Sequence, residues 1–297
     1  AGNAIAAPYD AGGGLATGDD SVAIGSGAAS QSLHSVAMGF NAKAVGINTT
    51  AIGSGTTADG DDATAIGRRA EAIGKYSTAV GDQAKANQEF SNALGYNATA
   101  DAVRSTAIGM GALVKGKDSF AIGNSTQVTG DYSVALGQQA KVDDSYASAV
   151  GFGAFAESIG SVAIGTWAKT SGVDSAALGN AANATGSESL ALGRSAKASG
   201  SASNAIGWNA NATAQNATAL GSNAQAYGLA SFAQGTSALA SGDASISIGE
   251  FSSATGKHSV AIGPSSSANL EKSVALGRES RTSTNAVTVT SATVGDI

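Results

Sequence analysis

Two histidines are the first residues to test for catalysis or metal binding. A histidine acts as a general base or a metal ligand only with partners within hydrogen-bond or coordination distance. His34 and His258 lie near opposite ends of the sequence, and no Ser-His-Asp arrangement can be assembled around either of them. Cysteine is absent, which excludes Cys-His catalysis and disulfides. The sequence therefore predicts no catalytic residues and no enzyme.

Three groups of aspartates raise the question of a calcium site, because carboxylates and loop carbonyls suit that ion. The groups are Asp19 with Asp20, Asp59 with Asp61 and Asp62, and Asp143 with Asp144. The nonapeptide pattern of calcium-binding β-helices is absent. We therefore expect solvated charges at turns, with no metal site and no cofactor.

A small basic group consists of Arg68, Arg69 and Lys75, a combination that would suit a sulfated glycan. Nearby acidic residues such as Asp61 and Glu71 offset its charge, so a solvated surface group is the favoured interpretation. The net charge of the chain is −6 and no basic block is present. We therefore expect no nucleic-acid partner.

A sequence repeat with a period of 14 contains all of these groups. The tripeptide Ala-Ile-Gly, or a close variant of it, occurs 19 times. Its glycine recurs every 14 residues from Gly25 to Gly277, with no insertion between repeats. We call these the anchor glycines. Residues 12–24 continue the pattern backwards by part of a repeat, and it stops after about Thr282. A fixed period without insertions predicts a solenoid in which each coil stacks on the previous one.

Small residues alternate with other residues in both halves of the repeat. Alanine lies two residues before the anchor in 18 repeats, and serine lies four before it in 15. Alanine also dominates three and five residues after the anchor. A period of two is the signature of β-strands. We therefore predict an all-β fold with two short strands per coil, whose small-residue faces oppose each other across a thin interior.

The residue just before each anchor is nearly always aliphatic, and alternation turns it away from the interior. Such a column would form an apolar stripe larger than monomeric proteins usually expose. Burying each Ile or Leu side chain would stabilise the protein by about 1.5–3 kcal/mol. We predict an obligate oligomer whose chains meet along this column, which we call the seam. The columns alone are compatible with an oligomer of two, three or four chains. The seam residues are Ile24, Met38, Ile52, Ile66, Val80, Leu94, Ile108, Ile122, Leu136, Val150, Ile164, Leu178, Leu192, Ile206, Leu220, Gln234, Ile248, Ile262 and Leu276.

Gln234 is the polar exception in the seam, and cyclic symmetry would bring its copies together near the axis. Asn92 and Asn204 lie in the neighbouring column, three residues before the anchor. Buried amides need hydrogen-bond partners. We predict a polar layer that sets register, in which these groups bind each other, a water molecule or an ion.

Aromatic residues gather at the expected corners of the coils. Tyr76 with Phe90, and Tyr132 with Tyr146, occupy equivalent positions one coil apart and should stack about 4.8 Å from each other. Packing where chains meet is favoured over an exposed patch for a protein ligand. The other corner aromatics are Phe40, Tyr96, Phe152, Trp167, Trp208 and Phe251.

The repeated Ser-Val-Ala-Ile-Gly, with Ala-x-Ala in the other half, resembles the YadA-like head of trimeric autotransporter adhesins over about Leu15–Thr282. The resemblance implies a left-handed parallel β-roll, an intertwined homotrimer and display on a bacterial surface. It also implies passive, multivalent adhesion to host matrix proteins of the collagen, fibronectin or laminin type, or to cells, and self-association. In that family a signal peptide and an outer-membrane anchor flank the passenger. We expect this chain to be an extracellular passenger fragment, attached to the membrane only through an absent C-terminal anchor.

Three segments are defined by the repeat boundaries. Residues 1–14 are predicted to be a lead-in or cap, residues 15–282 the head, and residues 283–297 a C-terminal strand or transition, with Ala286–Val294 as one strand. The family's neck motif is not found in the last segment.

Two other functions remain as alternatives. One is a spacer rod that does not adhere. The other is an ice-binding solenoid, which needs a regular two-wide threonine ladder. Thr50, Thr64 and Thr78 form a single column that Asn92 interrupts. A hexapeptide acyltransferase would need a period divisible by six, which 14 is not.

Overall fold

The computed structural model describes residues 9–282, and the chain divides into two compact units between Trp167 and Ala168. The first unit comprises residues 9–167 of the described chain and the second comprises residues 168–282. Each unit is an all-β parallel solenoid of 14-residue coils, and its described residues form no helix. This confirms the predicted fold class. The predicted strand Ala286–Val294 lies outside the described residues.

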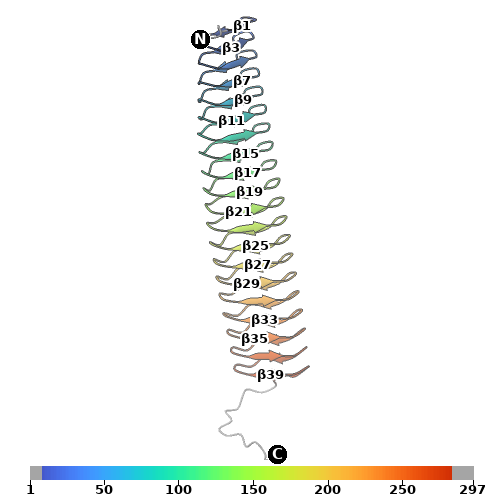
Figure 1. Cartoon of the computed structure of the whole chain (residues 1–297). Helices are drawn as coiled ribbons and strands as arrows, with labels where there is room; N and C mark the ends of the chain where they lie inside the picture. The colour runs from blue at the N-terminus through green and yellow to red at the C-terminus, as the bar shows by residue number, and fades with distance from the viewer. Residues whose placement is uncertain (1–8, 283–297) are drawn as a thin grey trace, which may run out of the picture. The chain divides into compact units, whose positions relative to one another are not determined.

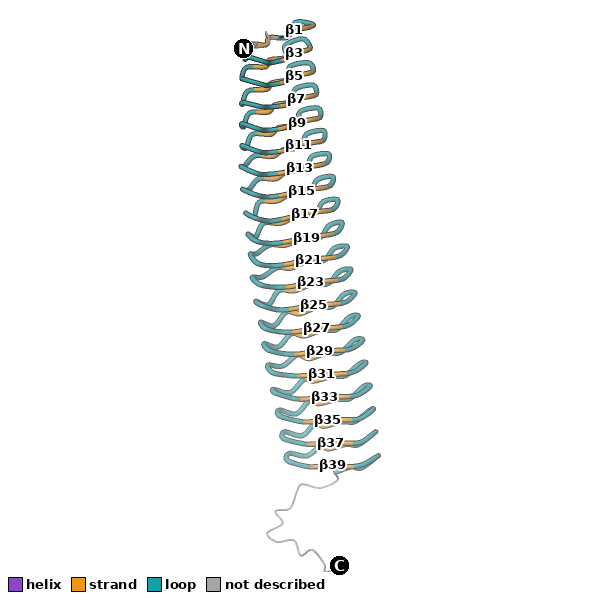
Figure 2. Tube along the Cα trace, viewed as in Figure 1, coloured by secondary structure: helices purple, strands orange, loops and turns teal. Residues whose placement is uncertain are grey.

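Two kinds of short strand alternate along the chain and are joined by tight turns (Figures 1 and 2). The three-residue strands end just before an anchor glycine and form sheet A of each unit, and the two-residue strands form sheet B. In the first unit sheet A consists of β1 (Tyr9–Ala11), β3 (Val22–Ile24), β5 (Val36–Met38), β7 (Thr50–Ile52), β9 (Thr64–Ile66), β11 (Thr78–Val80), β13 (Asn92–Leu94), β15 (Thr106–Ile108), β17 (Phe120–Ile122), β19 (Val134–Leu136), β21 (Ser148–Val150) and β23 (Val162–Ile164). Its sheet B consists of β2 (Leu15–Ala16), β4 (Ala29–Ser30), β6 (Lys43–Ala44), β8 (Thr57–Ala58), β10 (Glu71–Ala72), β12 (Lys85–Ala86), β14 (Thr99–Ala100), β16 (Leu113–Val114), β18 (Gln127–Val128), β20 (Lys141–Val142) and β22 (Phe155–Ala156).

The second unit repeats the same alternation. Its sheet A consists of β25 (Ala176–Leu178), β27 (Leu190–Leu192), β29 (Asn204–Ile206), β31 (Thr218–Leu220), β33 (Phe232–Gln234), β35 (Ile246–Ile248), β37 (Val260–Ile262) and β39 (Val274–Leu276). Its sheet B consists of β24 (Lys169–Thr170), β26 (Asn183–Ala184), β28 (Lys197–Ala198), β30 (Asn211–Ala212), β32 (Gln225–Ala226), β34 (Leu239–Ala240), β36 (Ser253–Ala254) and β38 (Ser267–Ala268).

Strand pairing is parallel, and its offset along the sequence equals the period of the repeat. For example, β11 pairs with β13 through Thr78 and Asn92, and β12 pairs with β14 through Lys85 and Thr99. Among the described pairings β1 alone departs from this offset, since Tyr9 pairs with Val22, one position short of the full period. Part of the predicted lead-in, residues 1–14, is therefore a strand of sheet A. The constant offset places each column of the sequence in one row of side chains.

Alanine fills the interior of both units, as predicted. The central residue of nearly every sheet A strand is a fully buried alanine, and the largest fully buried side chains are Val114, Val128 and Val142 in successive sheet B strands. Serines four residues before the anchors donate to turn carbonyls, as Ser175 does to Gly172 at 2.7 Å. The hydroxyl thus satisfies a buried backbone acceptor, which explains why serine recurs in that column.

The anchor glycine forms the corner after each sheet A strand. Gly137 has a φ of +129°, a conformation that residues with a side chain rarely adopt. A Cβ atom at Gly137 would lie 2.6 Å from the carbonyl oxygen of Gly151 in the next coil. Both the backbone conformation and the close stacking of coils therefore require glycine at this position.

Two further corner positions in each coil, two residues after the anchor and five before it, are left-handed without needing glycine. Asn97 has a φ of +53° and Phe90 has a φ of +57°. Asparagine tolerates this region, whereas a bulky residue there is unusual. The amide of Phe90 donates to the carbonyl of Lys75, and that of Asn97 to Asp82, both at 2.9 Å. Hydrogen bonds to the preceding coil therefore hold these corners.

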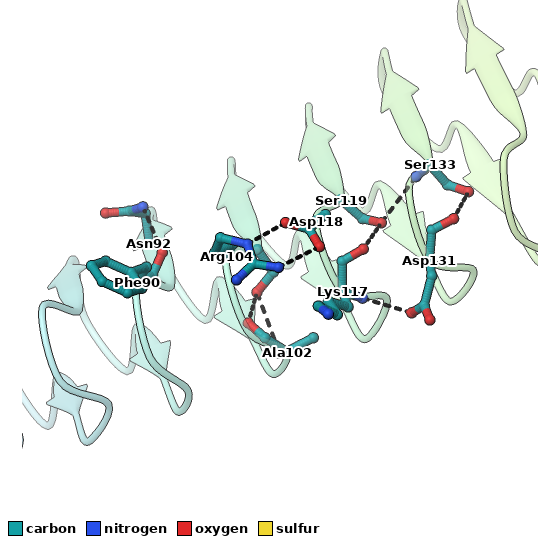
Figure 3. A network of polar contacts seen from close by, with 10 residues as sticks. Phe90, Asn92, Ala102, Arg104, Lys117, Asp118, Ser119, Asp131 and Ser133 are labelled. Carbon is teal, nitrogen blue, oxygen red and sulfur yellow. Dashed lines mark hydrogen bonds and ion pairs between the residues drawn. The ribbon is translucent and has the colours of Figure 1, made fainter.

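Corner side chains also pair with the equivalent residue one coil on. Arg104 contacts both carboxylate oxygens of Asp118, with Nη2 donating to Oδ2 at 2.8 Å (Figure 3). Arg68 binds Asp82 through one carboxylate oxygen, since Nε at 3.1 Å and Nη2 at 2.7 Å both donate to Oδ2. The hydrogen bond from Arg104 lowers the pKa of Asp118 below its ordinary value, and the hydrogen bond from Arg68 lowers the pKa of Asp82. Because these ion pairs are exposed to solvent, each of them stabilises the contact between two coils only modestly.

The anchor corner yields a test by substitution. We expect Gly137→Ala to lower the free energy of unfolding by about 2 kcal/mol or more, because a strained φ and a backbone clash both oppose the new Cβ. Gly55→Asn is the matched control, since Gly55 has a φ of +67° at a corner where Asn41 and Asn97 occur naturally. Urea denaturation measures both variants. Equal stability of Gly137→Ala and the parent would contradict the close-stacking argument.

The ion pairs yield a test by titration. Because the pKa of Asp118 is lower in the folded chain than in the unfolded chain, the pair stabilises the fold above the unfolded pKa. This contribution is lost as the pH falls through the lowered folded pKa. Arg104→Gln should raise the pKa of Asp118 toward its ordinary value, measured by NMR of the carboxyl carbon. Lys117→Gln should raise it less, because Lys117 acts only through a weaker charge interaction. An unchanged pKa in Arg104→Gln would refute the assignment.

Candidate binding surfaces

The seam column lies on the outer face of sheet A in both units. In the first unit it runs from Ile24 to Ile164, and in the second from Leu178 to Leu276. Ile122 and Ile164 are each 41% exposed, although a large aliphatic side chain ordinarily packs inside a protein. The single chain therefore presents an aliphatic row on each unit. Its use as a chain–chain seam stays a prediction.

A second row runs beside the seam on the same face. It consists of the residues three before each anchor, which share the outward side of the strand with the seam residue. This row is mixed in character: Phe120 is 44% exposed and Ile246 is 37% exposed, while Thr106 is half-buried. The outer face of sheet A is thus two side chains wide.

Gln234 interrupts the seam in the second unit. It is exposed and pairs in register with Leu220 before it and Ile248 after it. Asn92, in the first unit, donates from Nδ2 to the carbonyl of Phe90 at 3.3 Å (Figure 3). The polar register layer at Gln234 stays a prediction.

The two histidines lie at equivalent corner positions of different units. His34 in the first unit lies at a corner, with Nε2 3.4 Å from Asp20 and Nδ1 3.1 Å from Asn48, each one coil away. His258 lies at the equivalent corner position in the second unit. Among residues 9–282 there is no group of three or more His, Asp or Glu side chains that suits a metal ion.

The acidic and basic groups singled out from the sequence take part in corner contacts. Asp62 accepts a hydrogen bond from the side-chain amide of Asn48 at 3.0 Å, and Asp143 pairs with Lys141 at 2.8 Å. Arg68 binds Asp82, as described above. Lys75 lies 5.0 Å from the centre of the Tyr76 ring. The basic group is therefore divided among separate contacts.

The aromatic ladders form as predicted. The rings of Tyr76 and Phe90 stack at 4.9 Å with an interplanar angle of 9°, and those of Tyr132 and Tyr146 stack at 5.2 Å and 9°. All four rings are exposed, Tyr146 most of all at 64%. Exposure in the single chain is compatible both with packing against another chain and with a binding patch, so the choice between these stays open.

A shallow polar hollow of about 130 Å³ lies on the outer side of sheet B in the second unit, and sequence reasoning missed it. Asn211 donates from Nδ2 to the hydroxyl of Tyr227 at 3.2 Å, and Asn209 donates to Asn223 at 2.9 Å. One signal in the sequence points to it, a long stretch without acidic residues. The side chains that line the polar hollow are those of Ser195, Lys197, Asn209, Asn211, Gln225 and Tyr227, together with the small Ala210.

Residues 9–282 contain no helix of the length and apolar character that a membrane crossing would need.

The solved structures that are similar to this chain include the collagen-binding domain of the Yersinia adhesin YadA. It is 23% identical to this chain, with 60% of this chain and 68% of that chain covered and a TM-score of 0.24. No curated protein sequence matches the chain.

The family model described as the YadA head domain repeat matches from residue 16 to residue 280. Its matches are residues 16–43, 44–70, 72–91, 93–112, 115–140, 129–154, 145–166, 156–182, 171–196, 184–210, 198–224, 226–252 and 254–280. They cover well over half of the chain and follow the coils described above. Such heads are structural, adhesin-type domains exposed at the cell surface. The chain therefore belongs to the family of YadA head domain repeats, the heads of trimeric autotransporter adhesins.

Proposed function

We propose that this chain is the adhesive head of a homotrimer that attaches a bacterium to host extracellular matrix or cells. The observation that carries the proposal is the uncovered aliphatic seam, repeated in nearly every coil of a family built as trimers. The interior holds mainly alanine and serine, so it gives little hydrophobic stabilisation. Covering the seam with other copies of the chain supplies the missing apolar burial, about 1.5–3 kcal/mol for each fully buried Ile or Leu.

The mechanism is passive and multivalent. Three chains present each surface feature three times, so that weak contacts act together and overall affinity rises without new contacts. Collagen, fibronectin and laminin are the classes of ligand that we propose, with self-association as a further role. No catalytic step is part of this function, and no residue is assigned to one.

The proposed segments are those of the repeat boundaries. Residues 15–282 form the head, residues 1–14 lead into it, and residues 283–297 form a transition to the next segment. In the full-length protein an outer-membrane anchor holds the head at the cell surface, and the head itself lies outside the cell.

A charge in the seam tests the assembly. Ile164→Asp should raise the dissociation constant of the trimer at least about 100-fold, because three carboxylates would be buried without partners. Light scattering and sedimentation measure the oligomeric state. Thr99→Asp is the matched control, since it places the same charge on the outward side of sheet B. A folded trimer of Ile164→Asp would show that the seam lies elsewhere.

Solid-phase binding tests the adhesive role. The purified protein should bind at least one of immobilised collagen, fibronectin and laminin, and the Ile164→Asp variant should bind it about 10²–10⁴-fold more weakly through lost avidity. Thr99→Asp should bind like the parent. Absence of binding to all three, with the trimer intact, would favour a spacer that does not adhere.

A further inference from the structure

The second unit contains a long stretch without acidic side chains. No Asp or Glu occurs from Ser189 to Gly242, and no other stretch of the chain without them is as long. Arg194 and Lys197 are its only charged residues. Asparagine, glutamine, serine and threonine supply most of the remaining polarity. We call this stretch the amide band, and its outer surface is neutral to slightly basic in a chain whose net charge is −6.

The polar hollow lies within the amide band. It spans three successive coils, with Lys197 at the start of β28, Asn211 at the start of β30 and Gln225 at the start of β32. Tyr227 closes one side by reaching back to Asn211, a contact that runs diagonally across the rows instead of along one of them. The polar hollow lies beside this diagonal contact and is lined by side chains of all three coils.

The groups in the polar hollow match a hydroxyl-rich ligand. Amide side chains offer both donors and acceptors, and a sugar hydroxyl both donates and accepts. Asn209 and Asn211 are held in place by their contacts with Asn223 and Tyr227, so part of the site is preorganised. The volume of about 130 Å³ is below the roughly 300–1,000 Å³ of sites for drug-sized molecules. A single sugar ring is therefore the appropriate size class.

Lys197 adds a preference for negative charge. Its neighbours along the row are Asn183 and Asn211, and no carboxylate among the described residues forms an ion pair with it. A lysine without a protein partner is available to a carboxylate or sulfate on the ligand. A peptide strand fits poorly, because the backbone amides of Lys197 and Asn211 already donate to the next coil at 2.8 Å.

We propose that the polar hollow binds one acidic sugar residue of a host glycan. The amides of Asn209 and Gln225 contact its hydroxyls, and Asn211 positions Tyr227, whose ring bounds the site. Lys197 binds the carboxylate or sulfate. This site is separate from the seam, and its occupancy by a small saccharide does not depend on attachment to matrix proteins.

The test measures binding of small saccharides to the purified protein by saturation-transfer NMR and calorimetry. Sialyllactose carries a carboxylate and a heparin-derived disaccharide carries sulfate, so these two probes distinguish the sources of the acidic group. Lactose and inorganic sulfate are the comparators. We expect at least one acidic saccharide to bind, and both comparators to bind at least about tenfold more weakly. Lactose lacks the charge-assisted hydrogen bond to Lys197, and inorganic sulfate lacks the contacts of the sugar ring.

Variants then locate the site. Lys197→Gln should weaken binding of the acidic saccharide about tenfold, and Tyr227→Ala should remove the saturation-transfer signal. Lys43→Gln is the matched control, because Lys43 occupies the same position of its coil in the first unit, and it should bind like the parent. Circular dichroism confirms that each variant is folded. Unchanged binding by folded Lys197→Gln, or equal binding of inorganic sulfate, would overturn the proposal. Failure to bind matrix proteins would leave this result intact.

Discussion

The backbone pairing between one coil and the next, at a constant offset along the sequence, is the constraint on which the rest of this structure depends. Within each unit it places equivalent residues of successive coils in rows, so each column of the repeat has a similar environment from coil to coil. Coils that stack at strand spacing leave no room for a Cβ atom at the anchor corner of Gly137. The same stacking brings Arg104 to Asp118 and Tyr76 to Phe90, so that the surface is built of rows as well.

A coil of two short strands has an interior too thin for large side chains. Alanine fills it, and the largest fully buried residues are three valines in consecutive coils, Val114, Val128 and Val142. The aliphatic residues of the repeat are therefore outside, on sheet A. In most proteins the fold is stabilised within one chain and assembly comes second. In the proposed trimer the thin interior would link folding to assembly, because the aliphatic residues that it cannot hold recur on the outer face in nearly every coil.

Properties that belong to a whole column could be predicted from the sequence. The two strands, the alanine interior, the outward seam and the stacking of Tyr132 on Tyr146 all result from the constant period of the repeat. Features that depend on individual side-chain reach could not. The left-handed corner at Phe90, the capping of turn carbonyls by Ser175 and the shortened offset of β1 required the structure. The polar hollow was missed because the contact between Asn211 and Tyr227 crosses the rows diagonally.

The backbone hydrogen bonds between coils have a consequence for how the chain folds. The amide of Phe90 bonds to Lys75 in the coil before it, and that of Thr99 bonds to Ala112 in the coil after it, so the contacts between coils span almost the same length of chain. Closing each new coil therefore carries nearly the same entropic cost as closing the one before it. Adding coils lengthens a unit without lengthening its loops, and relative contact order falls as the number of coils rises. Within each unit of one chain, this constant cost favours folding that propagates from any nucleated pair of coils, whereas assembly of the proposed trimer would be a separate step.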